Sequence, residues 1–168
     1  IYKAVEKLNL QTQFNDILTK NHEPYIITKL IANLLKNVSL EEIINIVESI
    51  KIVPDLPEVI SVLKSRGYMV GIVSDSYDMV ANYIKNMIGA DIALANELEI
   101  KNNKVTGEVR IPSFFIRSDK SLCNHAVCKS NALIHLSEKY GVQLSDMIAV
   151  GDGENDICMI KHAGIGVA

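Results

Sequence analysis

Residues 147–160 read M-I-A-V-G-D-G-E-N-D-I-C-M-I, and this stretch decides the fold. The apolar run Met147–Val150 predicts a short strand that is buried on both faces. Gly151 and Gly153 let the backbone turn sharply after that strand, and the apolar spacing that follows predicts a helix. Asp152 is therefore expected just past the carboxyl end of a strand, where open α/β sheets bind their ligands.

The acidic residues of this stretch suit a magnesium site. Asp156 follows Asp152 by four residues, which allows both carboxylates to face one hard cation. Mg²⁺ prefers one or two carboxylates together with water and a substrate phosphate. The same residues could instead cap the following helix, since Asp and Asn accept bonds from its free N–H groups. The pattern G-D-G-x-N-D holds more polar residues than a cap needs, so the metal-binding interpretation is favoured.

Two further positions suit phosphate binding. Ser74 follows the predicted strand Tyr68–Val73, and its hydroxyl could bind a phosphate oxygen beside the next helix. Lys129 lies in the predicted helix His125–Tyr140. Taken alone, Ser74 could be only a helix cap, and a helical lysine usually faces solvent. Together with the acidic pair they are the parts that phosphoryl transfer requires.

The chain changes its pattern near Pro54 and Pro57. Ile1–Lys51 has apolar residues at helical spacing, a capping box that begins at Ser39, and no strand pattern. These residues predict a small helical bundle, which either completes the core or covers an active site as a cap. We therefore expect a helical cap domain, residues 1–51, and a core domain, residues 52–168.

The second domain alternates between helix and strand patterns, which predicts an α/β fold with a parallel sheet and helices on both faces. Residues 111–122 show no clear period and are expected to form a surface segment. The remaining predicted elements are helices at 56–65, 79–88 and 125–140, strands at 68–73, 91–95, 147–150 and from 164, and a hairpin of 98–100 with 105–109.

Composition narrows the class of partner. The net charge of −3 argues against nonspecific binding to nucleic acid or to an anionic membrane, and the sequence has no apolar run of about 20 residues. Cys123, Cys128 and Cys158 are an odd number for disulfides and show no zinc-binding spacing, which favours a reducing cytoplasm. Cys123-x4-Cys128 beside His125 could bind a metal, but incidental thiols are the favoured interpretation. The sequence gives no indication of the oligomeric state.

These motifs together resemble those of the haloacid dehalogenase (HAD) superfamily of phosphatases, in its phosphoserine phosphatase branch. The resemblance implies a HAD-like Rossmann-type core, an N-terminal C1 cap, and Mg²⁺-dependent hydrolysis of a small phosphorylated metabolite through an aspartyl-phosphate. It implies that Ser74 and Lys129 bind the phosphoryl group and act in catalysis. It also implies that Asp152 ligates Mg²⁺ while Asn155 and Asp156 support the site. We predict that Asp156 is a second metal ligand and that Asn155 binds phosphate.

The sequence also departs from that family. The motif D-x-D-x-[TV], which carries the Asp nucleophile, is absent from the 168 residues and is expected on a strand before Ile1. The 168 residues alone are therefore not expected to catalyse the reaction by the mechanism of that family. Asp75, a further phosphate-binding candidate, stands where the family usually has glycine. Ile1–Lys51 contains no arginine, which argues against phosphoserine as the substrate. A non-enzymatic binding or regulatory protein and a phosphotransferase remain alternatives.

Overall fold

The computed structural model describes residues 1–20 and 23–168, which form two compact units. The first unit covers Ile1–Arg110 and the second covers Ile111–Ala168. The cap–core boundary that the sequence suggests after Lys51 is a different division, and it stays a prediction. The break predicted at Asn21–Pro24 lies partly outside the described residues.

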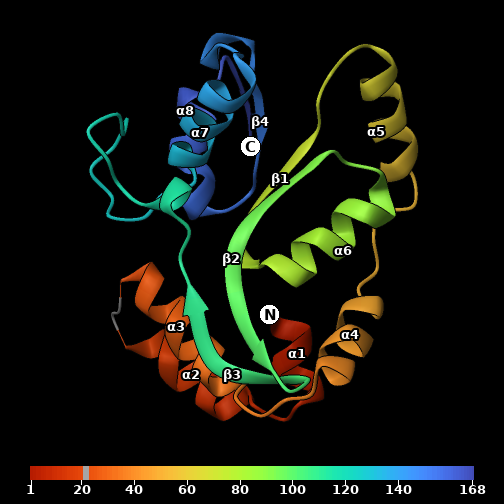
Figure 1. Ribbon diagram of the computed structural model, residues 1–168, viewed down its shortest axis with the longest axis vertical. Coiled ribbons are helices and arrows are strands. Elements are labelled where there is room, and N and C mark those ends of the chain that lie inside the picture. Colours follow the sequence, from red (N-terminus) through yellow and green to blue (C-terminus); the bar gives the residue numbers. More distant parts are fainter. Residues whose placement is uncertain (21–22) are drawn as a thin grey trace. The chain divides into compact units, whose positions relative to one another are not determined.

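The first unit contains helices followed by a three-stranded sheet of order β1-β2-β3 (Figure 1). Its elements are α1 (Tyr2–Lys7), α2 (Gln11–Thr19), α3 (Pro24–Leu34), α4 (Leu40–Glu48), α5 (Leu56–Ser65), β1 (Gly71–Tyr77), α6 (Asp78–Ile88), β2 (Ile92–Lys101) and β3 (Lys104–Arg110). β1 and β2 are parallel, and β2 and β3 form an antiparallel hairpin. β2 is longer than the predicted strand because it pairs with β1 along its first half and with β3 along its second.

Local signals decide several boundaries as predicted. The Ser39 hydroxyl accepts the Glu42 N–H (3.1 Å) and the Glu42 carboxylate accepts the Ser39 N–H (3.1 Å), so the capping box is confirmed. α6 ends at Gly89, whose φ of 72° suits glycine. Asn102 and Asn103 both have positive φ in the hairpin turn, the conformation that a two-residue loop requires.

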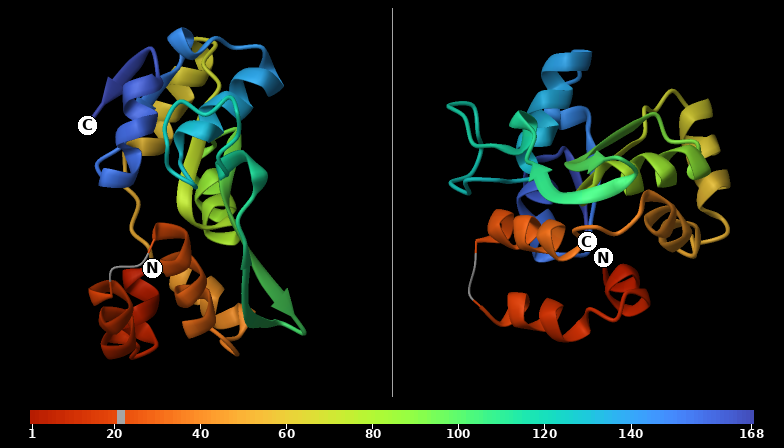
Figure 2. Two further views of the ribbon diagram at one scale, coloured as in Figure 1. Left: turned by 90° about the vertical axis from the view of Figure 1, so that its left-hand side faces the viewer. Right: turned by 60° about the horizontal axis from the view of Figure 1, so that its bottom comes forward.

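The helices of residues 1–51 do not form a bundle of helices alone. α3 packs against β3, and Figure 2 shows the β2–β3 hairpin beside these helices. One core joins the helix residues Ala32 and Val47 to Leu98 and Val105 of the hairpin. The Tyr77 hydroxyl donates to the Thr28 carbonyl (3.2 Å), and burial raises the pKa of that tyrosine. These helices are thus stabilised by contacts with strands that lie far from them in the sequence.

In the second unit, α8 packs against both strands of a two-stranded parallel sheet, β4-β5, and α7 packs against α8. Its elements are η1 (Ser113–Phe115), α7 (Ser130–Tyr140), η2 (Leu144–Asp146), β4 (Ile148–Val150), η3 (Glu154–Asp156), α8 (Ile157–His162) and β5 (Ile165–Val167). The parallel pairs β1–β2 and β4–β5 thus fall in two separate sheets, one in each unit.

The sequence interpretation of the second unit was wrong in three details. Only Ala149 of β4 is buried, whereas Ile148 and Val150 are exposed. Phe115, in the predicted surface segment, is 1% exposed and is a core residue. α7 begins at Ser130 rather than His125, because residues 126–128 pair instead with residues 115–117, as in the Ile116–Val127 bridge.

Candidate functional site

Ser74 lies inside β1 rather than after it, which corrects the predicted strand end. Regular pairing between β1 and β2 nevertheless stops at Val73 and resumes only at Tyr77, so Ser74 begins an irregular segment. Its half-buried hydroxyl accepts the Ser76 N–H at 3.1 Å. This hydrogen bond holds the Ser74 hydroxyl in place. The N-terminus of α6 follows at Asp78.

The acidic residues after Ser74 have distinct surroundings. Asp75 is exposed, and its carbonyl accepts a hydrogen bond from Nδ2 of the buried Asn96 (2.8 Å). The Asp78 carboxylate accepts the Leu98 N–H (3.2 Å), which joins α6 to β2. Sequence reasoning missed Asn96, since an isolated Asn in an apolar strand carries no recognisable motif. Asn96 fixes the backbone next to Ser74, so it is a positioning residue for this segment.

The G-D-G-E-N-D turn adopts the predicted strand–turn–helix form. Asp152 is exposed directly after β4, and Asn155 is exposed in η3. Asp156 is buried, and its Oδ2 accepts the Gly153 N–H at 3.2 Å. The turn thus leaves one carboxylate in solvent and folds the other back onto the backbone.

The buried carboxylate pairs with the predicted lysine. Lys129 Nζ lies 2.7 Å from Oδ1 of Asp156, and the two side chains are only 9% and 10% exposed. Lys129 caps the N-terminus of α7 rather than lying inside a helix. The structure therefore brings Lys129 and Asp156 together and gives both oxygens of Asp156 a protein donor. Whether Asp156 also ligates a metal stays a prediction.

The close approach of the turn to Asp156 explains Gly151. A Cβ at position 151 would lie 2.5 Å from the Asp156 Cβ and 2.6 Å from its Cγ, closer than non-bonded atoms can come. We expect Gly151→Ala to displace the carboxylate from Lys129 and to lower the free energy of unfolding by about 1–3 kcal/mol, as measured by urea denaturation. Gly71→Ala is the control, because its Cβ would meet Ile92 at an ordinary 3.5 Å. Equal stability of the two variants would contradict the packing argument.

The three cysteines lie together with His125 in the second unit. Burial alone would raise the pKa of Cys123, but hydrogen bonds from the His125 backbone and the Ser130 side chain outweigh it and lower the pKa to about 6. Burial and the neighbouring thiol groups raise the pKa of Cys158 to about 11. Sequence reasoning missed Cys158 as a member because it lies 30 residues beyond Cys128.

Residues 18–161 match the haloacid dehalogenase-like hydrolase family. The chain belongs to this family. Among its relatives, the phosphoserine phosphatase of Methanocaldococcus jannaschii is 37% identical over 140 residues, which are 81% of this chain and 60% of that protein. The phosphoserine phosphatase of Vibrio cholerae is 34% identical over 123 residues, 72% of this chain and 34% of that protein. The chain thus spans less than two thirds of the length of each of these relatives.

Solved structures of the haloacid dehalogenase-like family agree with the fold. A phospho-aspartyl intermediate analogue of phosphoserine phosphatase matches with a TM-score of 0.77 at 30% identity, over 96% of this chain and 75% of that one. The unliganded probable phosphoserine phosphatase of Vibrio cholerae matches with a TM-score of 0.80 at 26% identity, over 99% of this chain and 50% of that one. The predicted α/β fold and the predicted family resemblance are confirmed.

Proposed function

We propose that the protein is a magnesium-dependent phosphomonoester hydrolase that acts on a small phosphorylated metabolite through an aspartyl-phosphate. The observation that carries the proposal is the buried Lys129–Asp156 ion pair beside an exposed Asp152 on the G-D-G-E-N-D turn. Burying a charged pair is costly unless the geometry is good, and a purely structural turn has no need of one. The name of the solved phospho-aspartyl analogue supports the same chemistry.

We assign a role to each candidate residue. Ser74 binds a phosphate oxygen through its hydroxyl, and the backbone of Asp75 and the amide of Asn155 assist it. Lys129 neutralises negative charge on the phosphoryl group, and Asp156 orients that lysine. In phosphoryl transfer such positioning and charge neutralisation supply most of the rate enhancement.

The metal in this proposal is Mg²⁺, since the exposed carboxylate of Asp152 is the hard oxygen ligand that Mg²⁺ prefers. When bound, the ion supplies charge neutralisation at the phosphate oxygens. Asp156 remains a candidate second ligand, although its oxygens already accept from Lys129 and Gly153. Replacing Asp156 would distinguish a metal ligand from a residue that only orients Lys129, because loss of a ligand lowers the affinity for Mg²⁺ and loss of a positioning residue does not.

The reaction requires an Asp nucleophile that the 168 residues do not contain in a D-x-D-x-[TV] motif. The proposal therefore concerns the protein with that strand present. The carboxylate of the first Asp in that motif attacks phosphorus and forms the aspartyl-phosphate, while the ester oxygen leaves with a proton from the second Asp. Water then cleaves the acyl phosphate. The products are inorganic phosphate and an alcohol.

The substrate is proposed from the helices of residues 1–51, which we propose as a cap domain over the core of residues 52–168. A cap that closes excludes bulk water and reads the part of the substrate beyond the phosphate. Residues 1–51 contain no arginine, so the cap offers lysine rather than a bidentate guanidinium for a substrate carboxylate. We therefore propose a phosphomonoester of a small metabolite, with phosphoserine as the reference compound.

We also propose that the protein resides in the cytoplasm, and free cysteines support a reducing compartment. Within residues 1–20 and 23–168, none of the helices combines the length and the apolar character that crossing a bilayer requires.

The test begins with the intact mass and N-terminal sequence of the natively expressed protein, followed by a phosphatase screen with and without Mg²⁺. We expect magnesium-dependent release of inorganic phosphate, with phosphoserine hydrolysed more slowly than the best substrate. Transfer of the phosphoryl group to an added alcohol in preference to water would make the protein a phosphotransferase. Absence of any phosphate release from the native protein would overturn the proposal and favour a binding module.

A further inference from the structure

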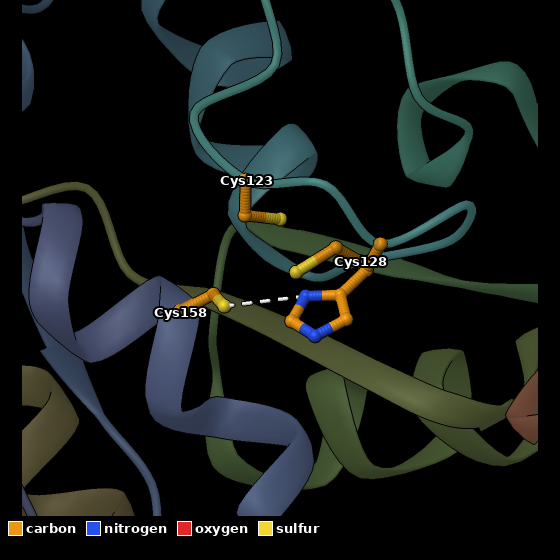
Figure 3. Close-up of side chains that lie close together, drawn as sticks. Cys123, Cys128 and Cys158 are labelled. Carbon is orange, nitrogen blue, oxygen red and sulfur yellow. Dashed lines mark hydrogen bonds between the residues drawn. The ribbon is translucent and has the colours of Figure 1, made fainter.

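A second group of ligand side chains lies apart from the carboxylates of the G-D-G-E-N-D turn. One ligand atom each from Cys123, His125, Cys128 and Cys158 lies within 4.8 Å of all the others. Figure 3 shows the three thiol groups pointing toward a common centre, and the Cys158 Sγ is 3.5 Å from Nδ1 of His125. All four residues belong to the second compact unit, so a single folded body determines this arrangement.

Two segments distant in sequence build the cluster. Cys123, His125 and Cys128 precede α7, in a segment that is held by the Cys128 N–H bond to the Phe115 carbonyl (2.9 Å) and by the Ile116–Val127 bridge. Cys158 comes from α8, which packs against α7. The cluster therefore connects a long irregular segment to a helix.

The donor set matches one kind of metal. Zinc in structural sites takes four Cys or His ligands in a tetrahedron, at about 2.3 Å to sulfur and about 2.0–2.1 Å to nitrogen. Sulfur atoms of such a tetrahedron are about 3.8 Å apart. The four ligand atoms lie within 4.8 Å of one another, so zinc binding requires each of these distances to shorten by about 1 Å at most. The three cysteines taken together follow no zinc-binding pattern in the sequence, but the interval Cys123-x4-Cys128 by itself lies within the range of zinc-binding loops. Soft thiolates also exclude Mg²⁺, which prefers oxygen.

We propose that Cys123, His125, Cys128 and Cys158 bind one zinc ion as a closed structural site. The ion forms four coordinate bonds and fixes residues 123–128 against α8.

The surroundings of the cluster agree with a built site. The fully buried Ser130 hydroxyl donates to the Cys128 Sγ (3.2 Å) and lies 3.6 Å from the Cys123 Sγ. A hydrogen bond of this kind orients a ligating sulfur. Cys128 is buried, whereas Cys123 and Cys158 are partly exposed and His125 is exposed. The metal can therefore enter from solvent and be anchored at the buried thiolate.

The first experiment measures metal in the protein purified without chelator and under reducing conditions. We expect about one zinc per chain by elemental analysis. Replacing zinc by Co²⁺ should produce the thiolate-to-cobalt absorption and the intense visible bands of a tetrahedral site. Removal of zinc with a chelator should lower the melting temperature, and added zinc should restore it. None of these measurements depends on phosphatase activity, so failure of the proposed function leaves this test intact.

Two variants test the ligand set. His125→Asn changes an exposed side chain and should leave the fold unchanged, while zinc affinity falls by about tenfold or more and the cobalt spectrum changes. Cys123→Ser should remove part of the thiolate-to-cobalt absorption. His162→Asn is the matched control, since it lies on the same helix as Cys158 but outside the cluster. The proposal is overturned if the protein binds no zinc under reducing conditions, or if His125→Asn and His162→Asn bind zinc equally well.

Discussion

Replacing Asp152 by asparagine is expected to lower magnesium-dependent phosphate release by about 10²–10³-fold in kcat/KM, the effect of losing one preorganised electrostatic group. The amide keeps the shape of the carboxylate but loses the charge that binds a hard cation. Asp152 is exposed on the turn after β4, so the free energy of unfolding should change by no more than about 0.5 kcal/mol. The measurement is a Mg²⁺ titration of initial rates, with the best substrate from the phosphatase screen, on the native protein and on the variant.

The control for this prediction is Asp146→Asn. Asp146 is also an exposed acid in the second unit, but it lies in η2, before β4 and outside the motif. It should leave both the rate and the Mg²⁺ dependence unchanged. An Asp152→Asn protein that retained full magnesium-dependent activity would falsify the assignment of this turn as the metal site.

Elements whose ends are coded locally were predicted well from the sequence. α5 begins and ends where its pattern predicts, and α6 stops at Gly89 because glycine adopts the left-handed conformation there. The hairpin follows from Asn102-Asn103 in the same way. Each of these signals acts over fewer than about five residues, and one sequence is enough to read it.

Features that depend on distant partners were not predicted. The start of α7 was placed five residues early, since the apolar spacing of residues 125–129 suits a helix and the competing pairing with residues 115–117 is invisible in the spacing. For the same reason, nothing in the sequence links Cys158 to Cys123. The sequence assigns Lys129 and Asp156 to one site, but it does not predict the direct ion pair between them. The residue types of the candidate site could be named from motifs, but their partners required the fold.

The Lys129–Asp156 pair should have the largest effect on stability. Lys129→Met keeps the length of the side chain and removes its charge, which leaves the Asp156 carboxylate buried beside an apolar group. Breaking a buried pair by removing one partner costs about 3–5 kcal/mol, because the remaining charge is uncompensated. We expect a loss of this size in the free energy of unfolding of the second unit, measured by urea denaturation with hydrogen exchange to localise it.

A double-mutant cycle separates the interaction from the cost of each substitution. Asp156→Asn retains an acceptor for the Gly153 N–H but removes the negative charge that pairs with Lys129. The double variant should be less destabilised than the sum of the two single variants, with a coupling energy of about 2–3 kcal/mol.

Lys120→Met is the control, since Lys120 pairs with Glu138 in the same unit but both side chains are exposed. Such exposed pairs contribute about 0–1 kcal/mol. If Lys129→Met were no more destabilising than Lys120→Met, the pair would not be the buried anchor of the G-D-G-E-N-D turn. A coupling energy of the expected size would instead mean that the turn and the segment before α7 are stabilised as one unit. Lys129 and the G-D-G-E-N-D turn would then hold a fixed geometry before any substrate arrives.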